Sequence, residues 1–293
     1  MQKRGYSPPP PASSGVVEQV VVAKGLLRFS SIADYKQLMD QPTPEAERQF
    51  TEKVRGLSGF TSLQRACEQG GQRTADDELA ELIDNTYFKE MLNEDLSVWI
   101  EDWVFRVNPE DEKVYVIDAD LVDTKYDELI AQNTGDPDVK EYSTALNVLD
   151  IVGNPDDQPQ GLFCSQSGIG SRNVGEPLND GSGRTAFSAY AKYGIYFSLF
   201  TRIETIGSSA PVYRFDYSGN MWLGAPHVYY HVRCGSTADY ATVSTGTWTG
   251  TAFKYQSYQG STALNQVYYY VHIRSNTTPY AQLATQFGFR VNI

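Results

Sequence analysis

The first half of the chain contains three segments in which apolar residues recur at helical spacing. The segments 31–39, 43–59 and 76–92 each have an apolar face, which predicts three helices. Ser31 has an acidic residue three positions later and Thr43 is followed by proline, and both patterns are typical of helix N-caps. We therefore expect the first two helices to begin directly after these two residues.

Strand-like runs surround the helical segments. β-prone stretches at 16–22 and 25–29 precede them, and alternation of apolar and polar residues follows at 98–107 and 114–117. Acidic turn formers in the middle of 98–107 predict a hairpin there. Two short amphipathic segments, 126–131 and 139–148, complete an α+β first half.

The second half is strand-like throughout. Alternating runs at 195–203, 213–217, 227–234, 267–273 and 287–291 are separated by Gly and Ser, and such spacing is typical of antiparallel sheets. The fold class we expect is α+β, with a small helical and hairpin N-terminal domain followed by an antiparallel, jelly-roll-like β-sandwich.

A run of turn formers without large apolar residues, 153–161, predicts the linker between these two domains. The expected organisation has a Pro/Ser-rich tether with a β-prone segment at 1–24, an α+β domain at 25–152 and an all-β domain at 162–293. The basic, Pro-rich and Ser-rich start is what a secreted or lipid-anchored bacterial protein retains after its signal peptide is removed. We expect an extracellular or outer-membrane-anchored protein rather than a cytoplasmic one.

The composition of the chain limits the classes of partner that we expect it to bind. The chain has 36 acidic and 24 basic residues, a net charge of -12, which disfavours nucleic acid and anionic lipid headgroups. The membrane is therefore expected to be reached only through a lipid tether. The cysteines Cys67, Cys164 and Cys234 lack the spacing of a zinc site, and either a Cys164–Cys234 disulfide or three free thiols fits the sequence.

Catalytic and metal signatures are weak. His227 and His231 are four residues apart, but on a strand that spacing separates them by about 13 Å. The acidic residues at 118–123 do not follow the pattern of a calcium loop, and no Gly-x-Ser-x-Gly elbow occurs. We therefore assign no catalytic residue, no metal ligand and no cofactor, and expect the protein not to be an enzyme.

Aromatic residues of the second half are the best binding candidates. Their rings present apolar faces with polar edges that can stack on sugars, although cross-strand packing of the same rings is the alternative. The candidate ligand-binding residues are Tyr229, His231, Tyr268, Tyr270, His272, Trp222 and Trp248.

Three motifs in the first half resemble uncharacterised cell-envelope lipoproteins and secreted proteins of the Bacteroidetes. They are the Leu-x-Phe-x-Ser opening at 27–35, Gly-Phe-Thr-Ser-Leu at 59–63 and Leu-Asn-x-Asp before the hairpin at 91–100. The resemblance covers residues 26–118, and Glu101-Asp102 departs from it where glycine is usual. It implies that Met1 stands in place of a lipidated cysteine, and it implies no activity or catalytic residue.

These observations together predict a non-catalytic, cell-surface or secreted binding protein that recognises a glycan or a surface protein through its β-sandwich. A polysaccharide-acting hydrolase is one alternative. A structural or assembly subunit, whose segment 16–22 adds to the sheet edge of a neighbour, is the other.

Overall fold

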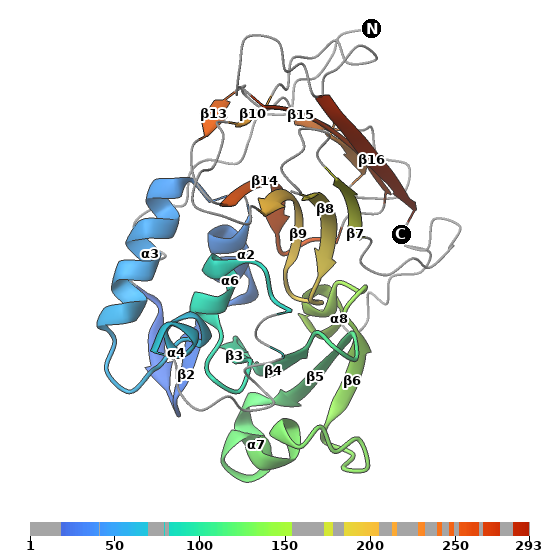
Figure 1. Ribbon diagram of the computed structural model, residues 1–293. Coiled ribbons are helices and arrows are strands. Elements are labelled where there is room, and N and C mark those ends of the chain that lie inside the picture. Colours follow the sequence, from blue (N-terminus) through green and yellow to red (C-terminus); the bar gives the residue numbers. More distant parts are fainter. Residues whose placement is uncertain are drawn as a thin grey trace, which may run out of the picture. The chain divides into compact units, whose positions relative to one another are not determined.

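The computed structural model (Figure 1) describes most of the first half of the chain and parts of the second. Backbone and side chains are described for 19–40, 42–69, 79, 82–153, 190–198, 200 and 259–263. The backbone alone is described for the strand residues 173–177, 185–189, 199, 201–204, 213–215, 228–231, 239–241, 246–248, 252–258, 266–275 and 284–292.

The chain forms two compact units. Unit 1 comprises Met1–Gln158 with two later segments, Lys192–Tyr196 and Gly260–Ala263, and unit 2 comprises the remainder. Unit 1 is therefore built from three separate stretches of the chain. The predicted linker 153–161 lies outside the described residues except for Gly153, and the division into independent domains stays a prediction.

Unit 1 contains a six-stranded sheet in the order β1-β2-β3-β4-β5-β6. Strands β2 and β3 are parallel, whereas all other neighbours are antiparallel. The strands are β1 Val21–Ala23, β2 Leu26–Phe29, β3 Ser97–Ile100, β4 Trp103–Asn108, β5 Lys113–Asp118 and β6 Lys140–Ser143.

Four helices with described bounds lie along the chain between β2 and β3, and the predicted caps of the first two are confirmed. The side chain of Ser31 accepts a hydrogen bond from Asp34 N at 3.0 Å, and that of Thr43 accepts one from Ala46 N at 3.2 Å. The helices are α2 Ile32–Met39, α3 Pro44–Gly56, α4 Leu63–Gln69 and α6 Thr86–Met91; α7 Val122–Ile130 and α8 Val148–Gly153 follow later.

Both faces of the central strands are buried. Phe29 of one face packs against Tyr35 and Phe50 of the helices α2 and α3, with ring centroids 5.2 and 6.4 Å apart. On the other face Val104 and Ile117 belong to a core cluster with residues of α7. Figure 1 shows α7 on one side of β4 and β5 and α6 on the other. The sheet is therefore the middle layer of unit 1.

The predicted hairpin at 98–107 is confirmed as β3 and β4. Ile100 pairs with Trp103, so that Glu101 and Asp102 form a two-residue turn. Glu101 has a φ of 56°, the left-handed conformation that such turns require and that glycine adopts most easily.

The predicted helix over 76–92 is wrong in its middle. Residues 82–85 are not helical, and a new helix begins after Asn85, whose side chain accepts a hydrogen bond from Phe88 N at 2.8 Å. An Asn side chain competes with the helical backbone pattern and therefore starts a helix better than it continues one. The apolar face was nevertheless identified correctly, because Ile83, Tyr87 and Met91 are buried.

Two further predictions need adjustment. The β-prone run 16–22 contributes only its end to β1, because Gln19 is assigned to a helix and residues 16–18 lie outside the described residues. The amphipathic segment 139–148 consists of strand β6 and the start of α8, whereas 126–131 belongs almost entirely to the helix α7.

The segment Lys192–Tyr196, which joins β8 to β9, completes the core of unit 1; we call it the inserted segment. Phe88 stacks on Tyr193 and Tyr196, with ring centroids 5.4 and 4.6 Å away. Gly194 N donates to Thr144 O at 2.9 Å, and Gly194 O accepts from Val148 N at 3.0 Å. Aromatic packing and backbone hydrogen bonds therefore both hold this segment.

Unit 2 consists of strands in its described parts. One sheet has the order β14-β9-β8-β7, and another contains β12-β11-β15-β10-β13 with β16 paired to β15. The strands are β7 Asn173–Pro177, β8 Thr185–Lys192, β9 Phe197–Glu204, β10 Tyr213–Phe215, β11 Val228–His231, β12 Asp239–Ala241, β13 Gly246–Trp248, β14 Ala252–Gly260, β15 Gln266–Ser275 and β16 Ala284–Asn292. The chain as a whole is mixed helix and strand, as predicted.

No helix within the described part of the chain is long and apolar enough to cross a membrane.

Candidate functional site

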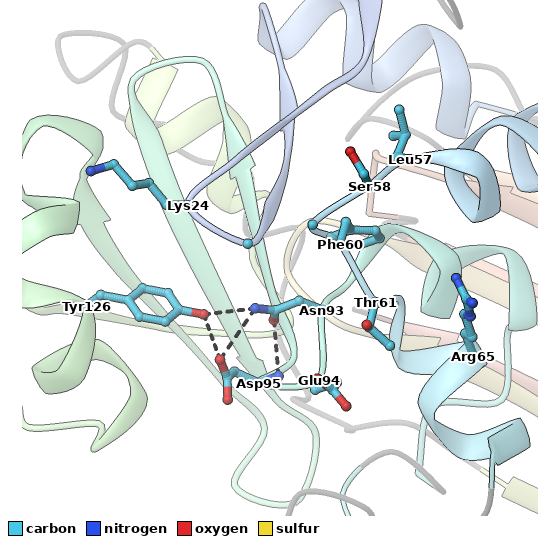
Figure 2. Close-up of a pocket in the computed structure, with 12 residues that line it drawn as sticks. Lys24, Leu57, Ser58, Phe60, Thr61, Arg65, Asn93, Glu94, Asp95 and Tyr126 are labelled. Carbon is cyan, nitrogen blue, oxygen red and sulfur yellow. Dashed lines mark hydrogen bonds between the residues drawn. The ribbon is translucent and has the colours of Figure 1, made fainter.

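A pocket of about 520 Å³ opens on the surface of unit 1 (Figure 2). Five chain segments line it: the β1–β2 turn, the loop between α3 and α4, the first half of α4, the loop between α6 and β3, and α7. The lining residues are Lys24, Gly25, Leu57, Ser58, Gly59, Phe60, Thr61, Arg65, Asn93, Glu94, Asp95 and Tyr126. Its volume lies within the range of ligand pockets, and most of its side chains are polar.

Tight turns bring the backbone to the rim of the pocket. Ala23 pairs with Leu26, and Lys24 and Gly25 between them have φ values of 55° and 76°. Positive φ at both central residues defines a type I′ turn, which matches the twist of a β-hairpin. Gly59, with a φ of 79°, turns the chain after α3. The local sequence therefore fixes these two walls.

Asn93 organises the opposite wall. Its side-chain oxygen accepts hydrogen bonds from Asp95 N at 3.1 Å and from Ser97 N at 2.9 Å, which closes a turn before β3. The backbone of Asn93 also bridges that of Ser62, next to Thr61 in the pocket. One largely buried side chain thus shapes the loop that carries Asp95.

Tyr126 connects this loop to α7. The phenol oxygen accepts a hydrogen bond from Asn93 Nδ2 at 3.0 Å and donates its own proton to Asp95 Oδ2 at 2.9 Å (Figure 2). Burial is the main cause that raises the pKa of Tyr126 to about 12; the hydrogen bond from Asn93 lowers this pKa, whereas the neighbouring Asp95 carboxylate raises it further. The phenol is therefore a permanent donor at neutral pH.

Charged groups of both signs flank the pocket. Lys24 forms an ion pair with Asp123 of α7, outside the lining. Arg65 makes a long contact of 3.5 Å from Nη1 to the carbonyl oxygen of Arg55. Within the described residues no ion pair is formed by Arg65, Glu94 or Asp95. Donors and acceptors are thus both available to a bound molecule.

A second carboxylate lies behind this wall and is fully paired. Glu90 is 3% exposed in its side chain and accepts two hydrogen bonds from the Arg55 guanidinium, at 2.7 and 2.9 Å. Ser62 Oγ donates to its other oxygen at 2.5 Å. The pKa of Arg55 is raised by its hydrogen bonds to Glu90 and then Glu68. This cluster is closed and supports the loop between α3 and α4.

The described ligand-binding candidates from the sequence belong to unit 2 and are not among the residues that line this pocket. Tyr229 of β11 is directly opposite Tyr268 of β15. Because strand residues alternate between faces, the positions of Tyr229, His231, Tyr268, Tyr270 and His272 belong to one face of the sheet. The register therefore brings together five of the predicted positions.

Of the remaining predicted positions only Trp248 is described, and it does not belong to that face. Trp248 is opposite Tyr213, which is opposite Ser275. Ser275 is an odd number of residues from His272, so Trp248 belongs to the other face of the sheet. Trp222 and Met1 lie outside the described residues.

The structure describes only some of the residues considered for a metal site or a disulfide. No group of three His, Cys, Asp or Glu residues suited to a metal occurs in the described part of the chain. Cys67 is exposed and free, whereas Cys164 and Cys234 lie outside the described residues. Asp123, one of the acidic residues of 118–123, is used in the ion pair with Lys24.

Sequence reasoning missed the pocket. The Asn-x-Asp pattern at 93–95 is a turn signal that was available in the sequence. However, Tyr126 follows Asn93 by 33 residues, and no local pattern connects the two. Matching family models, curated proteins or solved structures were not found for this chain.

Proposed function

We propose that the protein is a non-catalytic binding protein that recognises a glycan. The observation that carries this proposal is the pocket of unit 1, where a carboxylate, a guanidinium, an ammonium and hydroxyls surround one opening. A sugar hydroxyl donates and accepts hydrogen bonds, so that a wall offering both kinds of partner suits it. An ordered wall such as the one built by Asn93 also lowers the entropic cost of binding.

The aromatic positions of unit 2 are a second candidate surface for the same function. Their support is the register, which places Tyr229, His231, Tyr268, Tyr270 and His272 on one face. We propose further that unit 2 is a jelly-roll-like β-sandwich, an architecture whose broad faces suit extended ligands.

The proposed location is the cell surface or the extracellular space, as the resemblance to Bacteroidetes envelope lipoproteins suggests. A lipid tether at the position of Met1 is part of this proposal. Mass spectrometry of the protein purified from its own host tests it, since an N-terminus without acyl chains would contradict the tether.

A glycan array with the full chain tests the function and separates the two surfaces. The pocket variant is Arg65→Ala, which removes a cation without an ion pair in the described structure. The unit 2 variant is Tyr229→Ala with Tyr270→Ala. Arg48→Ala is the matched control, because Arg48 is 57% exposed on α3 and lies outside the lining.

Saturable binding that is lost in Arg65→Ala but retained in the double variant and in Arg48→Ala supports the pocket. If binding is instead lost in the double variant and retained in Arg65→Ala, the glycan is recognised by the aromatic face of unit 2. A wild-type chain that binds no glycan contradicts the proposal and leaves protein recognition or assembly, which sedimentation at several concentrations would detect.

A further inference from the structure

In the hydrogen bonds between Asn93, Tyr126 and Asp95, each donor and acceptor can be assigned. This assignment restricts which chemical groups a ligand can present to the pocket. Asn93 Oδ1 accepts from two backbone N–H groups, which fixes the orientation of its amide. Its Nδ2 group must then face Tyr126 and Asp95, at 3.0 and 3.4 Å from their oxygens. The orientation of this one amide determines the rest of the network.

The same assignment of donors and acceptors extends from Tyr126 to the carboxylate of Asp95. Tyr126 accepts from Asn93 and therefore has its single proton left to donate to Asp95 Oδ2. The series of donors thus ends on Asp95, which receives hydrogen bonds and gives none. Within the described residues, Oδ1 of Asp95 has no hydrogen-bond partner, and the side chain is only half-buried at the pocket.

We infer that Asp95 determines the specificity of this pocket, and that the ligand must present a hydrogen-bond donor to it. This inference rests on the proposed glycan recognition and defines the class of glycan. Neutral sugars satisfy the requirement through their hydroxyl groups. The carboxylate of a uronate, or a sulfate group, at the same position has acceptors only and would face a like charge.

The supporting network explains why Asp95 cannot adapt to an anion by turning away. Its carboxylate is held by Tyr126, and its own backbone carbonyl accepts a hydrogen bond from Arg106 Nη1 at 2.7 Å. Main chain and side chain are therefore both anchored. Discrimination by a fixed acceptor is strong because a mismatched ligand leaves unpaired groups.

The test is Asp95→Asn in the full chain, on an array that carries neutral, uronate-containing and sulfated glycans. The amide of this variant keeps the size of the side chain, loses its charge and offers N–H donors. We expect the wild type to prefer neutral glycans, and Asp95→Asn to bind them about tenfold more weakly while its preference against anionic glycans disappears. Asp120→Asn is the control, since it makes the same change at an exposed position outside the lining.

Circular dichroism and a thermal melt establish that the variant is folded before the arrays are compared. If the wild type binds anionic glycans and Asp95→Asn leaves this binding unchanged, the inference is overturned while glycan recognition stands. If the wild type binds no glycan, both the proposed function and the inference are overturned.

Discussion

The inserted segment and the pocket are two parts of unit 1 that differ in how far their residues are buried. All residues of the inserted segment, 192–196, are buried, and the Tyr193 hydroxyl donates to Leu82 O at 3.1 Å. At the pocket, Lys24, Ser58 and Glu94 are exposed. The first region is closed by packing, whereas the second is ordered by hydrogen bonds and left open. Substitutions in the first should therefore change stability, and those in the second should change binding.

The largest effect is expected at Gly194. It has a φ of 76°, and a Cβ atom there would lie 2.5 Å from Val114 Cγ2 and 3.1 Å from Val148 Cγ2. A valine methyl on a buried strand cannot move aside easily. Gly194→Ala should lower the free energy of unfolding by about 2 to 4 kcal/mol, combining backbone strain with overpacking, as chemical denaturation would measure.

Gly59→Ala is the matched control for this substitution. Gly59 has almost the same φ, 79°, but nothing lies within 4 Å of the added Cβ. Only the backbone cost should remain, about 1 kcal/mol. Equal losses in the two variants would show that Gly194 is not tightly packed and would remove the contrast between the two regions.

A smaller effect is expected at the hydroxyl group of Tyr35. This side chain is fully buried, and its hydroxyl donates to Ile195 O in the inserted segment at 3.1 Å. Tyr35→Phe leaves that carbonyl without this donor, so unfolding should become easier by about 1 to 2 kcal/mol. Thermal denaturation would measure the change.

Tyr142→Phe on β6 provides the comparison. Tyr142 is half-buried, and within the described residues no hydrogen bond of its hydroxyl is seen. Its substitution should change stability by less than about 0.5 kcal/mol. A Tyr35→Phe variant as stable as Tyr142→Phe would mean that the inserted segment does not depend on this bond.

The two regions also differ in how far they could be predicted. Capping residues, the β3–β4 hairpin and the buried faces of α2 and α3 follow from spacing, because they depend on neighbours a few residues apart. Ile195 lies in the run 195–203 that was predicted to be a strand and Tyr193 lies just before it, but both belong to the turn before β9, which begins at Phe197. Their partners Leu82 and Tyr35 are 111 and 160 residues away in sequence. No periodicity within the run identifies such partners.

The pocket was missed for a related reason. The turn residue Asn93 has a local signal, but the site needs Lys24, Arg65 and Tyr126 as well, each from a different segment. The aromatic residues of β11 and β15 were easier to notice because strand alternation is visible in one run. Sequence patterns thus favour sites on single elements over sites assembled from loops.

Apart from the control substitutions, the smallest effect on stability at neutral pH is expected for Tyr126→Phe in the pocket. The side chain is half-buried, and the loss of its hydrogen bond to Asp95 should cost about 1 kcal/mol or less.

The pH dependence of the free energy of unfolding is more informative about Tyr126. Burial raises the pKa of Tyr126 from its ordinary value of 10.0 to about 12. The folded protein therefore holds this proton more tightly than the unfolded chain does. The resulting stabilisation is fully present below pH 10 and is lost as the pH rises toward 12. Ultraviolet titration of tyrosinate in the wild type, minus that of Tyr126→Phe, should give a single transition near 12. A difference transition near 10 would mean that the phenol is exposed to solvent and does not form the wall of the pocket.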